Sequence, residues 1–267
     1  MRTSVVFFIS FSLLLILAVL LRLDVPAIAV FTLGVAGLFM AQIAAKNYSI
    51  ERTIMYPALF IMGAVCFYFI YDAVALSINP WQLVKNFIAA SIEEFAKQST
   101  QMPLNAENIN FIKDNKDNFI NGFIQIFPSM VIILSVLIIW LNFLLGKDYL
   151  RRVGIVSPGG AMLARWKAPD LIIWIFIISG GLLFMPQKDI NFLSLNIFLV
   201  ACFIYVLQGL AIVSFLFQSK NVPVFLRYIF YFLIAVQQIL VIPIATIGLM
   251  DVWVDFRKFF QKNQTTA

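Results

Sequence analysis

The sequence contains no histidine, only two cysteines and few charged residues. The absence of histidine removes the commonest metal ligand and the usual general base at neutral pH. The two cysteines, Cys66 and Cys202, lie within apolar runs far apart in the sequence, and no metal-binding or basic motif accompanies either one. We therefore interpret them as small apolar side chains, in preference to a disulfide, a metal site or a catalytic thiol.

Charged residues make up 12% of the 267 residues, whereas hydrophobic residues make up 62% and the mean hydropathy is +0.95. A soluble domain has about 25% charged residues, because water must wet its surface. Such an excess of apolar residues cannot be hidden in a core, so the chain must have lipid as its solvent. The sequence predicts an all-α, polytopic protein in contact with the lipid bilayer. The net charge of +6 is scattered between apolar runs, which is typical of topology signals and not of nucleic-acid binding.

Apolar runs recur along the chain at the length of transmembrane helices. A span needs roughly 20 apolar residues, and seven runs reach or approach this length: 4–21, 25–45, 54–78, 120–145, 170–186, 192–217 and 225–249. The first run is long for the apolar part of a signal peptide, so we keep it as a helix. We expect a single integral membrane domain over 1–267 with about seven transmembrane helices.

A stripe of small residues marks the second run, where Gly37, Ala41 and Ala45 recur at a spacing of four. Small side chains let another helix approach closely. Helix packing within this chain explains the stripe, and a docking face for a membrane protein partner is the alternative.

The segment 79–119 is a polar insertion outside the spans. Its first half is predicted to form an amphipathic helix at the membrane surface, since its apolar residues fall on one helical face. The adjacent Glu93 and Glu94 point in different directions on a helix, so we interpret Glu93 with Lys97 as a surface pair and not as an acid/base site. The apolar face consists of Trp81, Val84, Ile88, Ile92 and Phe95.

Basic residues predict the orientation of the chain. The densest cluster is expected on the cytoplasmic side, and seven spans then place the N-terminus inside and the C-terminus outside. The basic residues of the C-terminal tail favour the opposite side for that end. The cluster consists of Lys147, Arg151, Arg152, Arg165 and Lys167.

Several polar residues lie within the apolar runs and are candidates for a ligand site. Asp72 is the one acid well inside a run, with Tyr68 one turn before it; a functional carboxylate and a carboxylate at the interface or paired across helices both remain open. Pro243 is expected to kink the last run. Uncharged amides in lipid need partners, so contacts between helices explain the others more simply than a substrate pocket does. The ligand-binding candidates are Tyr68, Asp72, Asn196, Tyr205, Gln208, Gln237 and Gln238.

The chain carries none of the common catalytic or nucleotide-binding motifs, and the segment Ser157-Pro158-Gly159-Gly160 is interpreted as a loop turn. Without histidine or a nucleophile–base pair, we expect no enzyme, no metal site and no cofactor.

Residues 142–258 resemble the YybS-like family of bacterial membrane proteins, also called domain of unknown function 2232. The most specific pieces are Trp166 with Pro169, Asn196 with Gln208-Gly209, and the closing Asp251 with Asp255-Phe256-Arg257. The resemblance implies a bacterial inner (cytoplasmic) membrane location and no assigned reaction. Members also look distantly similar to the S components of energy-coupling-factor transporters. In that comparison, only Ala41 and Ala45 match the small-residue face that docks a scaffold subunit.

The segment 250–267 is predicted to form an interfacial helix that fixes the end of the last span. One face is apolar and aromatic, and Asp251, Asp255 and Lys258 lie on another, with Asp255 and Lys258 able to pair. Arg257 can stack on Trp253 one turn earlier. Gly248 is expected to let the chain turn into the membrane plane. A docking site for a partner is the alternative reading of these charges.

Two functions follow as hypotheses. The first is a small-solute binding or transport-associated membrane subunit, suggested by the polar residues inside the spans and by the likeness to S components. The alternative is a structural or assembly protein of the cell envelope that acts through lateral helix contacts. The alternative predicts that the buried polar residues are paired within the helix bundle.

Overall fold

The computed structural model describes residues 27–46, 48–99, 111, 114–152 and 163–258. The chain divides into two compact units, Met1–Ile155 and Val156–Ala267, and each is described by itself. The described residues form α-helices and one short 3-10 helix, with no strand among them, so the all-α class is confirmed. The expected first helix over 4–21 lies outside the described residues.

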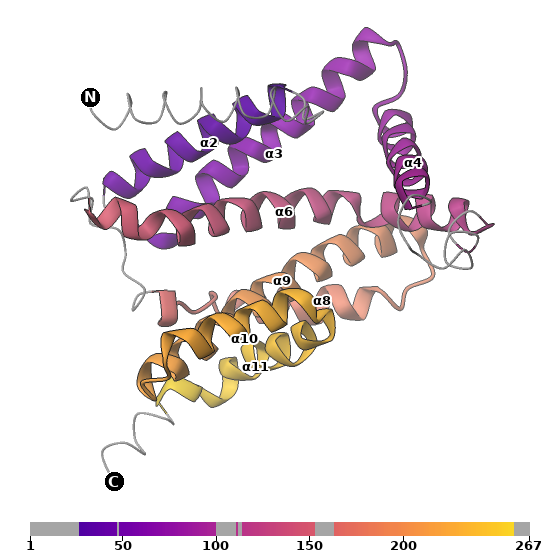
Figure 1. The fold of residues 1–267 in the computed structure, drawn as a ribbon. Coiled ribbons are helices and arrows are strands. Elements are labelled where there is room, and N and C mark those ends of the chain that lie inside the picture. Colours follow the sequence, from indigo (N-terminus) through magenta and orange to yellow (C-terminus); the bar gives the residue numbers. More distant parts are fainter. Residues whose placement is uncertain (1–26, 47, 100–110, 112–113, 153–162, 259–267) are drawn as a thin grey trace. The chain divides into compact units, whose positions relative to one another are not determined.

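The first unit is built around one central helix. This helix, α3 (Ile50–Ala75), packs against α2 (Ala27–Ala45), α4 (Pro80–Ser99) and α6 (Lys116–Arg152), as Figure 1 shows. Helices α3 and α6 begin four residues before the apolar runs that predicted them, so polar residues form their first turns.

Helix α4 confirms the helix expected in the polar insertion, but its surroundings differ from the expectation. Val84 and Ile88 are buried against Ile120 of α6, so the middle of the apolar face packs on protein and not on the membrane surface. Trp81 and Phe95, toward the ends of the same face, are exposed. Outside the apolar face, Glu93 forms an ion pair of 3.7 Å with Lys116 of α6.

The second unit begins with a helical hairpin. Helix α8 (Leu171–Leu182) lies against α9 (Lys188–Ser219), and the ring of Phe176 stacks on that of Phe198 with centroids 4.9 Å apart. The Asn191 side chain donates a 2.8 Å hydrogen bond to the Leu183 carbonyl and closes the turn between the two helices. These contacts fix α8 and α9 as antiparallel neighbours.

The remaining helices of this unit are α10 (Val224–Val236), the 3-10 helix η1 (Gln238–Leu240) and α11 (Val241–Val254). The chain bends by 104° between α10 and the segment that follows it. The expectation of one helix over 225–249, kinked at Pro243, is therefore wrong. The helix breaks at Gln237, whose φ and ψ of −98° and 87° are not helical. Pro243 lies in the first turn of α11, where a missing N–H costs no helical hydrogen bond.

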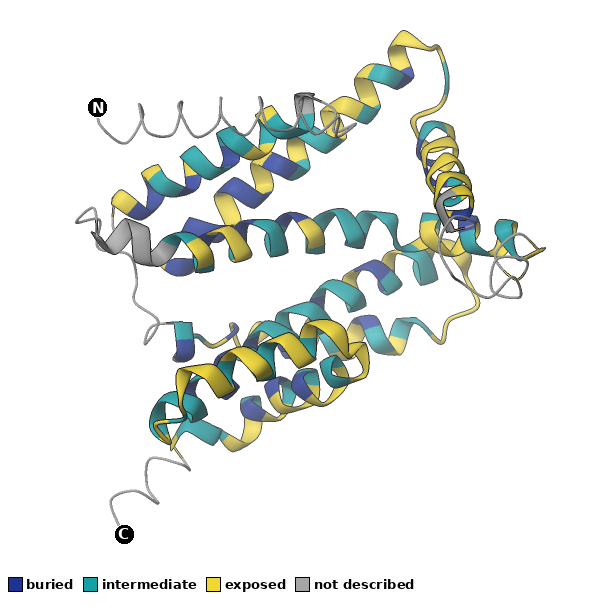
Figure 2. Cartoon of the chain, viewed as in Figure 1, coloured by how far each residue is buried: buried dark blue, intermediate teal, exposed yellow. Residues whose placement is uncertain are grey.

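Three helices in the described part of the chain are long and apolar enough to cross a membrane: α3, the segment Lys116–Gly146 of α6, and α9. The bent pair of α10 and α11 gives a fourth if it is counted as one span, while Ala29–Ala45 and Leu171–Leu182 are shorter apolar helices. The expected count of seven is not confirmed. Figure 2 shows that much of the helix surface is exposed, as expected where lipid surrounds apolar side chains.

Candidate functional site

A buried carboxylate lies in the second unit where α9, the end of α11 and the residues before α8 meet. Asp251, near the end of α11, is 1% exposed, and both of its oxygens accept hydrogen bonds. The Gln208 amide of α9 donates to Oδ2 over 3.0 Å, and the backbone N–H of Phe256 donates to Oδ1 over 2.9 Å. The Arg257 guanidinium lies 3.5 Å from Oδ2. A carboxylate can be buried at tolerable cost only when it is paired in this way.

Gln208 joins Asp251 to a third segment of the chain. This side chain is fully buried, and its Oε1 accepts a 3.2 Å hydrogen bond from the backbone N–H of Ala168, just before α8. The amide oxygen of Gln208 therefore accepts a hydrogen bond from the segment before α8, and its nitrogen donates one to α11. Replacing it with an apolar side chain would leave the Ala168 N–H without this partner.

Arg257 closes the network from the C-terminal side. Its Nη2 donates a 2.7 Å hydrogen bond to the carbonyl of Trp166, and only 12% of its side chain is exposed. Its Nε is buried without a hydrogen-bond partner in the structure. Burial lowers the pKa of Arg257, and the carboxylates of Asp251 and Asp255 oppose that shift. An arginine stays charged in spite of such a shift. We call Gln208, Asp251, Arg257 and the backbone of residues 166–168 the polar node.

The chain reaches the polar node through a reversal at Asp255. Helix α11 ends at Val254, and Asp255 has a left-handed conformation with φ 46°, which aspartate tolerates better than most residues. The Lys258 ammonium lies 2.8 Å from the Asp255 carboxylate, so the expected pair is confirmed. A hydrogen bond from Lys258 lowers the pKa of Asp255, while Asp255 raises the pKa of Lys258.

Two glycines allow α9 and α11 to touch backbone to backbone. A β-carbon on Gly209 would overlap the carbonyl of Ile244, and one on Gly248 would overlap the carbonyl of Tyr205. This close crossing holds the two helices where Gln208 can reach Asp251. The sequence analysis expected Gly248 to turn the chain into the membrane plane, and this expectation is wrong. Gly248 lies inside α11, at the helix crossing.

The C-terminal segment also differs from the interfacial helix that the sequence predicts. The continuous helix is wrong, because it is interrupted at Asp255. Asp251 lies in the polar node and not on a solvated stripe. Arg257 reaches Trp166 and Asp251 instead of stacking on Trp253, whose side chain is exposed. Residues 259–267 lie outside the described part of the chain.

The contact between Arg257 and Trp166 in the polar node fixes the position of the chain after α10 and α11. Residues 166–168 precede α8, and α8 and α9 are antiparallel, so α9 ends on the side of this unit where α8 begins. Helix α10 leaves from that side, yet Arg257, beyond α11, contacts Trp166 on the same side. The two outer ends of this broken helix pair therefore lie on the same side of the unit, and we call α10, η1 and α11 the re-entrant hairpin. The sequence expectation that 225–249 crosses to the side opposite Arg165 and Lys167 competes with this arrangement and stays a prediction.

The other polar candidates of the second unit do not converge on the polar node. Asn196 donates to the carbonyl of Phe192 over 2.9 Å, within its own helix. Tyr205 is buried and packs edge to face on Phe176, with centroids 5.7 Å apart. Gln237 and Gln238 are exposed at the tip of the re-entrant hairpin.

The candidates of the first unit form a local pair. Tyr68 and Asp72 interact one turn apart on α3, as the sequence suggests. Helix α3 ends at Ala75, three residues after Asp72, and Asp72 is half-buried while Tyr68 is exposed. This position, within a turn of the helix end, favours a carboxylate near the interface.

The small-residue stripe of α2 is not the face that packs inside the first unit. The buried positions are Ala36, Met40, Ile43 and Ala44, whereas Gly37 and Ala41 are half-buried and Ala45 is exposed. A β-carbon on Gly37 would meet no atom within 4 Å. Packing within this chain, as far as the structure describes it, therefore does not explain the stripe.

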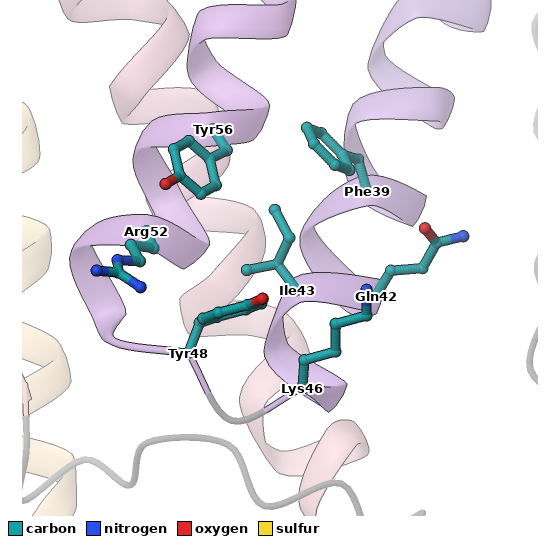
Figure 3. A pocket seen from close by; sticks show the side chains of 7 residues that line it. All are labelled: Phe39, Gln42, Ile43, Lys46, Tyr48, Arg52 and Tyr56. Atoms are coloured by element: carbon teal, nitrogen blue, oxygen red, sulfur yellow. The ribbon is translucent and has the colours of Figure 1, made fainter.

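The first unit also contains an open pocket of about 330 Å³ between the end of α2 and the start of α3 (Figure 3). Its aromatic walls are Phe39, Tyr48 and Tyr56. Its polar residues are Gln42, Lys46 and Arg52, none of which the sequence analysis singled out as site residues. Among the residues that the structure describes, no group of three or more Cys, Asp or Glu side chains is placed to hold a metal ion.

These features define a helical membrane protein whose C-terminal unit is held together by a buried ionic network. A family model described as "Predicted membrane protein (DUF2232)" matches residues 1–252, and the chain belongs to this family. It is 24% identical over 231 residues to a protein of Bacillus subtilis (strain 168) titled "Uncharacterized protein YybS", which covers 84% of this chain and 73% of the relative. No solved structure matches. The expected likeness to S components is not shown by these matches.

The polar node also contains most of the residues that carried the resemblance. Trp166, Gln208, Asp251 and Arg257 belong to it, the backbone N–H of Phe256 donates to Asp251, and Gly209 lies at the adjoining helix crossing. What the sequence analysis missed are backbone groups, the N–H of Ala168 and the carbonyl of Trp166. The shared motif of Trp166 and Pro169 was the available signal for that loop.

Proposed function

We propose that the protein is a structural or assembly subunit of the inner membrane, with several membrane-spanning helices, which acts through lateral contacts of the re-entrant hairpin. The observation that carries this proposal is the exposed tip of that hairpin. Gln237 and Gln238 are both exposed there, and the backbone between α10 and η1 leaves the helical conformation. Irregular backbone and amide side chains inside an apolar layer need protein or water to satisfy them.

Helix α10 presents the tip together with an aromatic face. None of its 13 residues is buried, and one stripe of the helix carries Phe225, Tyr228, Phe232 and Val236, which are 60–71% exposed. The start of α10 is anchored, because Arg227 donates hydrogen bonds to the carbonyls of Val222 and Phe217. The polar node anchors α11 at the other end. A rigid hairpin with an aromatic side and a polar tip suits a helical membrane protein partner better than lipid alone.

Pairing of the buried polar groups supports the same function. Gln208 and Asp251 use their polar atoms inside the unit, so they are not free to bind a solute. Among the ligand-binding candidates of the second unit, Gln237 and Gln238 remain exposed, and they lie at the proposed contact surface.

The proposal is tested by photo-crosslinking in native membranes. A photoreactive amino acid at Gln238 or Phe232 should give one dominant protein adduct. The same probe at Trp174, an exposed residue on α8, is the control and should give lipid adducts. Lipid adducts alone at Gln238, or links only to other parts of the same chain, would contradict lateral contact with a partner.

A small-solute binding or transport-associated subunit is the second candidate. It is favoured by the open pocket between α2 and α3, whose volume of about 330 Å³ falls within the range of ligand pockets. Thermal shifts of the purified protein with a panel of vitamins, nucleosides and metabolites test this candidate. A panel without any shift, together with no co-purifying ligand, counts against it.

A further inference from the structure

The tip of the re-entrant hairpin carries amide groups that have no partner. In the part of the chain that the structure describes, the side chains of Gln237 and Gln238 form no hydrogen bond, and both residues are exposed. A carboxamide has an acceptor oxygen and two N–H donors, and leaving these groups unpaired in an apolar layer costs free energy. The tip therefore needs a partner that both donates and accepts hydrogen bonds.

The rest of the hairpin offers a partner no charge to pair with. Residues 228–250 contain no Asp, Glu, Lys or Arg. Arg227, just before them, donates from Nε and Nη2 to the carbonyls of Val222 and Phe217 in its own chain. Opposite charges therefore cannot select a partner along this surface, and recognition depends on packing and on the amides of the tip.

An exposed stripe of α10 leads to the tip. Its residues follow one another at spacings of three and four, so they share one helix face. Phe230 lies on a different face, because its ring packs on that of Phe217 of α9 with centroids 5.2 Å apart. Figure 2 shows the ribbon of α10 largely exposed, and the stripe ends next to Gln237. The stripe consists of Phe225, Tyr228, Phe232 and Val236.

A second copy of this chain meets both requirements by symmetry. Copies of one membrane protein insert with the same orientation, so a two-fold axis along the membrane normal places equal residues of two copies at equal depth. The tip amides of the two copies then lie level, and each carboxamide can donate an N–H to the oxygen of the other. The aromatic rings of two stripes also meet at equal depth, where they can pack on each other. A different protein would need a polar group of its own at this depth.

We propose that the re-entrant hairpin is the contact between two copies of this chain, formed by the stripe of α10 and the amides of Gln237 and Gln238. The inference names the partner for the lateral contact proposed above and rests on that function. Both copies contribute the same residues to the contact, as a two-fold interface requires.

Disulfide cross-linking in native membranes tests the contact. The background is the full-length chain with Cys66 and Cys202 replaced by serine, expressed in the same cells with two different epitope tags. Phe232→Cys and Val236→Cys should each give, on oxidation, a dimer of twice the 30.3 kDa chain mass that carries both tags. Phe230→Cys, two residues from the stripe on the side of α10 that packs on α9, is the matched control and should stay monomeric. Equal cross-linking at 230 and 232, or none at either stripe position, overturns the proposal.

Substitution of the tip amides tests their part in the contact. Gln237→Leu combined with Gln238→Leu should weaken self-association by roughly tenfold, because two hydrogen bonds of the strength found between membrane helices are lost. Dilution-dependent energy transfer between labelled copies in detergent micelles measures the change. Thr246→Val is the control, since this exposed threonine donates to the Ile242 carbonyl of its own helix, and self-association should be unchanged. A double variant that self-associates as tightly as the wild type would overturn the proposal.

The photoreactive probe at Gln238 separates this inference from the proposed function. An adduct between two copies supports both. A single protein adduct of another mass would keep lateral contact and overturn the second copy as its partner. Links only within one chain, or to lipid alone, would overturn both.

Discussion

Substituting Gly248 with alanine should destabilise the protein, although alanine normally favours a helix by about 1 kcal/mol over glycine. The added β-carbon would overlap the Tyr205 carbonyl oxygen and lie 2.7 Å from the Gly209 nitrogen. Both are backbone atoms within α9, so they cannot move aside as a side chain can. Helices α9 and α11 would have to separate, which would also stretch the 3.0 Å hydrogen bond between Gln208 and Asp251.

Overpacking of this kind costs about 1–3 kcal/mol. At roughly 2–4 °C per kcal/mol, Gly248→Ala should lower the melting temperature by about 2–12 °C. Unfolding can be followed with a thiol-reactive dye, because Cys202 is partly buried in α9; the exposed Cys66 is first replaced by serine. The control is Gly181→Ala, where a β-carbon would meet no atom within 4 Å and the melting temperature should be unchanged or higher. A Gly248→Ala protein as stable as the control would refute the close helix crossing.

Other substitutions test the charges. Asp251→Leu should cost about 3–5 kcal/mol, because it leaves Arg257 buried without its carboxylate, and adding Arg257→Met should recover most of that loss in a double-mutant cycle. Reversing the surface pair, Asp255→Lys with Lys258→Asp, should lower the melting temperature slightly, because lysine tolerates the left-handed conformation of residue 255 less well than aspartate does. Because the pKa of Asp255 is lowered, its small contribution is present above about pH 4 and lost below it; Asp255→Asn should flatten the acid limb of a stability profile. Asp72→Leu should unfold at the wild-type temperature, and a clear drop would indicate pairing across helices.

The positions of the long helices could be predicted from apolar runs. Helices α3, α6 and α9 begin within four residues of the runs that predicted them, because a stretch of apolar residues has few alternatives to a helix in lipid. The helix of the polar insertion was also predictable from its periodicity. The packing of this helix on α6 could not be predicted, because the sequence pattern of an apolar face is the same whether protein or membrane covers that face.

The re-entrant hairpin could not be predicted from composition. Residues 225–249 are continuously apolar, and the break at Gln237 carries neither proline nor glycine. Pro243, the visible helix breaker, is accommodated in a first turn. The return of the chain is decided by contacts between residues 40 to 91 positions apart in the sequence, which no local pattern encodes.

Single residues of the polar node could be predicted from the sequence, but the contacts between them could not. Gln208 and Asp251 stood out as polar residues in or beside apolar runs, but their spacing gave no reason to pair them. The resemblance grouped Trp166, Gln208 and Arg257 as shared features without saying that they touch. The sequence alone does not tell whether Asp251, at the end of a helix, is solvated or buried. It is buried because an arginine and a glutamine that are distant in the sequence from each other contact it.

The side of the membrane reached by the C-terminal segment tests the account most directly. Single cysteines at Lys167, Gln187 and Lys258, all exposed positions, can be labelled in intact cells with a membrane-impermeant maleimide after Cys66 and Cys202 are replaced by serine. The re-entrant hairpin predicts that positions 167 and 258 behave alike and that position 187, at the turn between α8 and α9, behaves oppositely. Labelling of position 258 together with 187 would mean that the last helices cross the membrane, and would contradict the contact between Arg257 and Trp166.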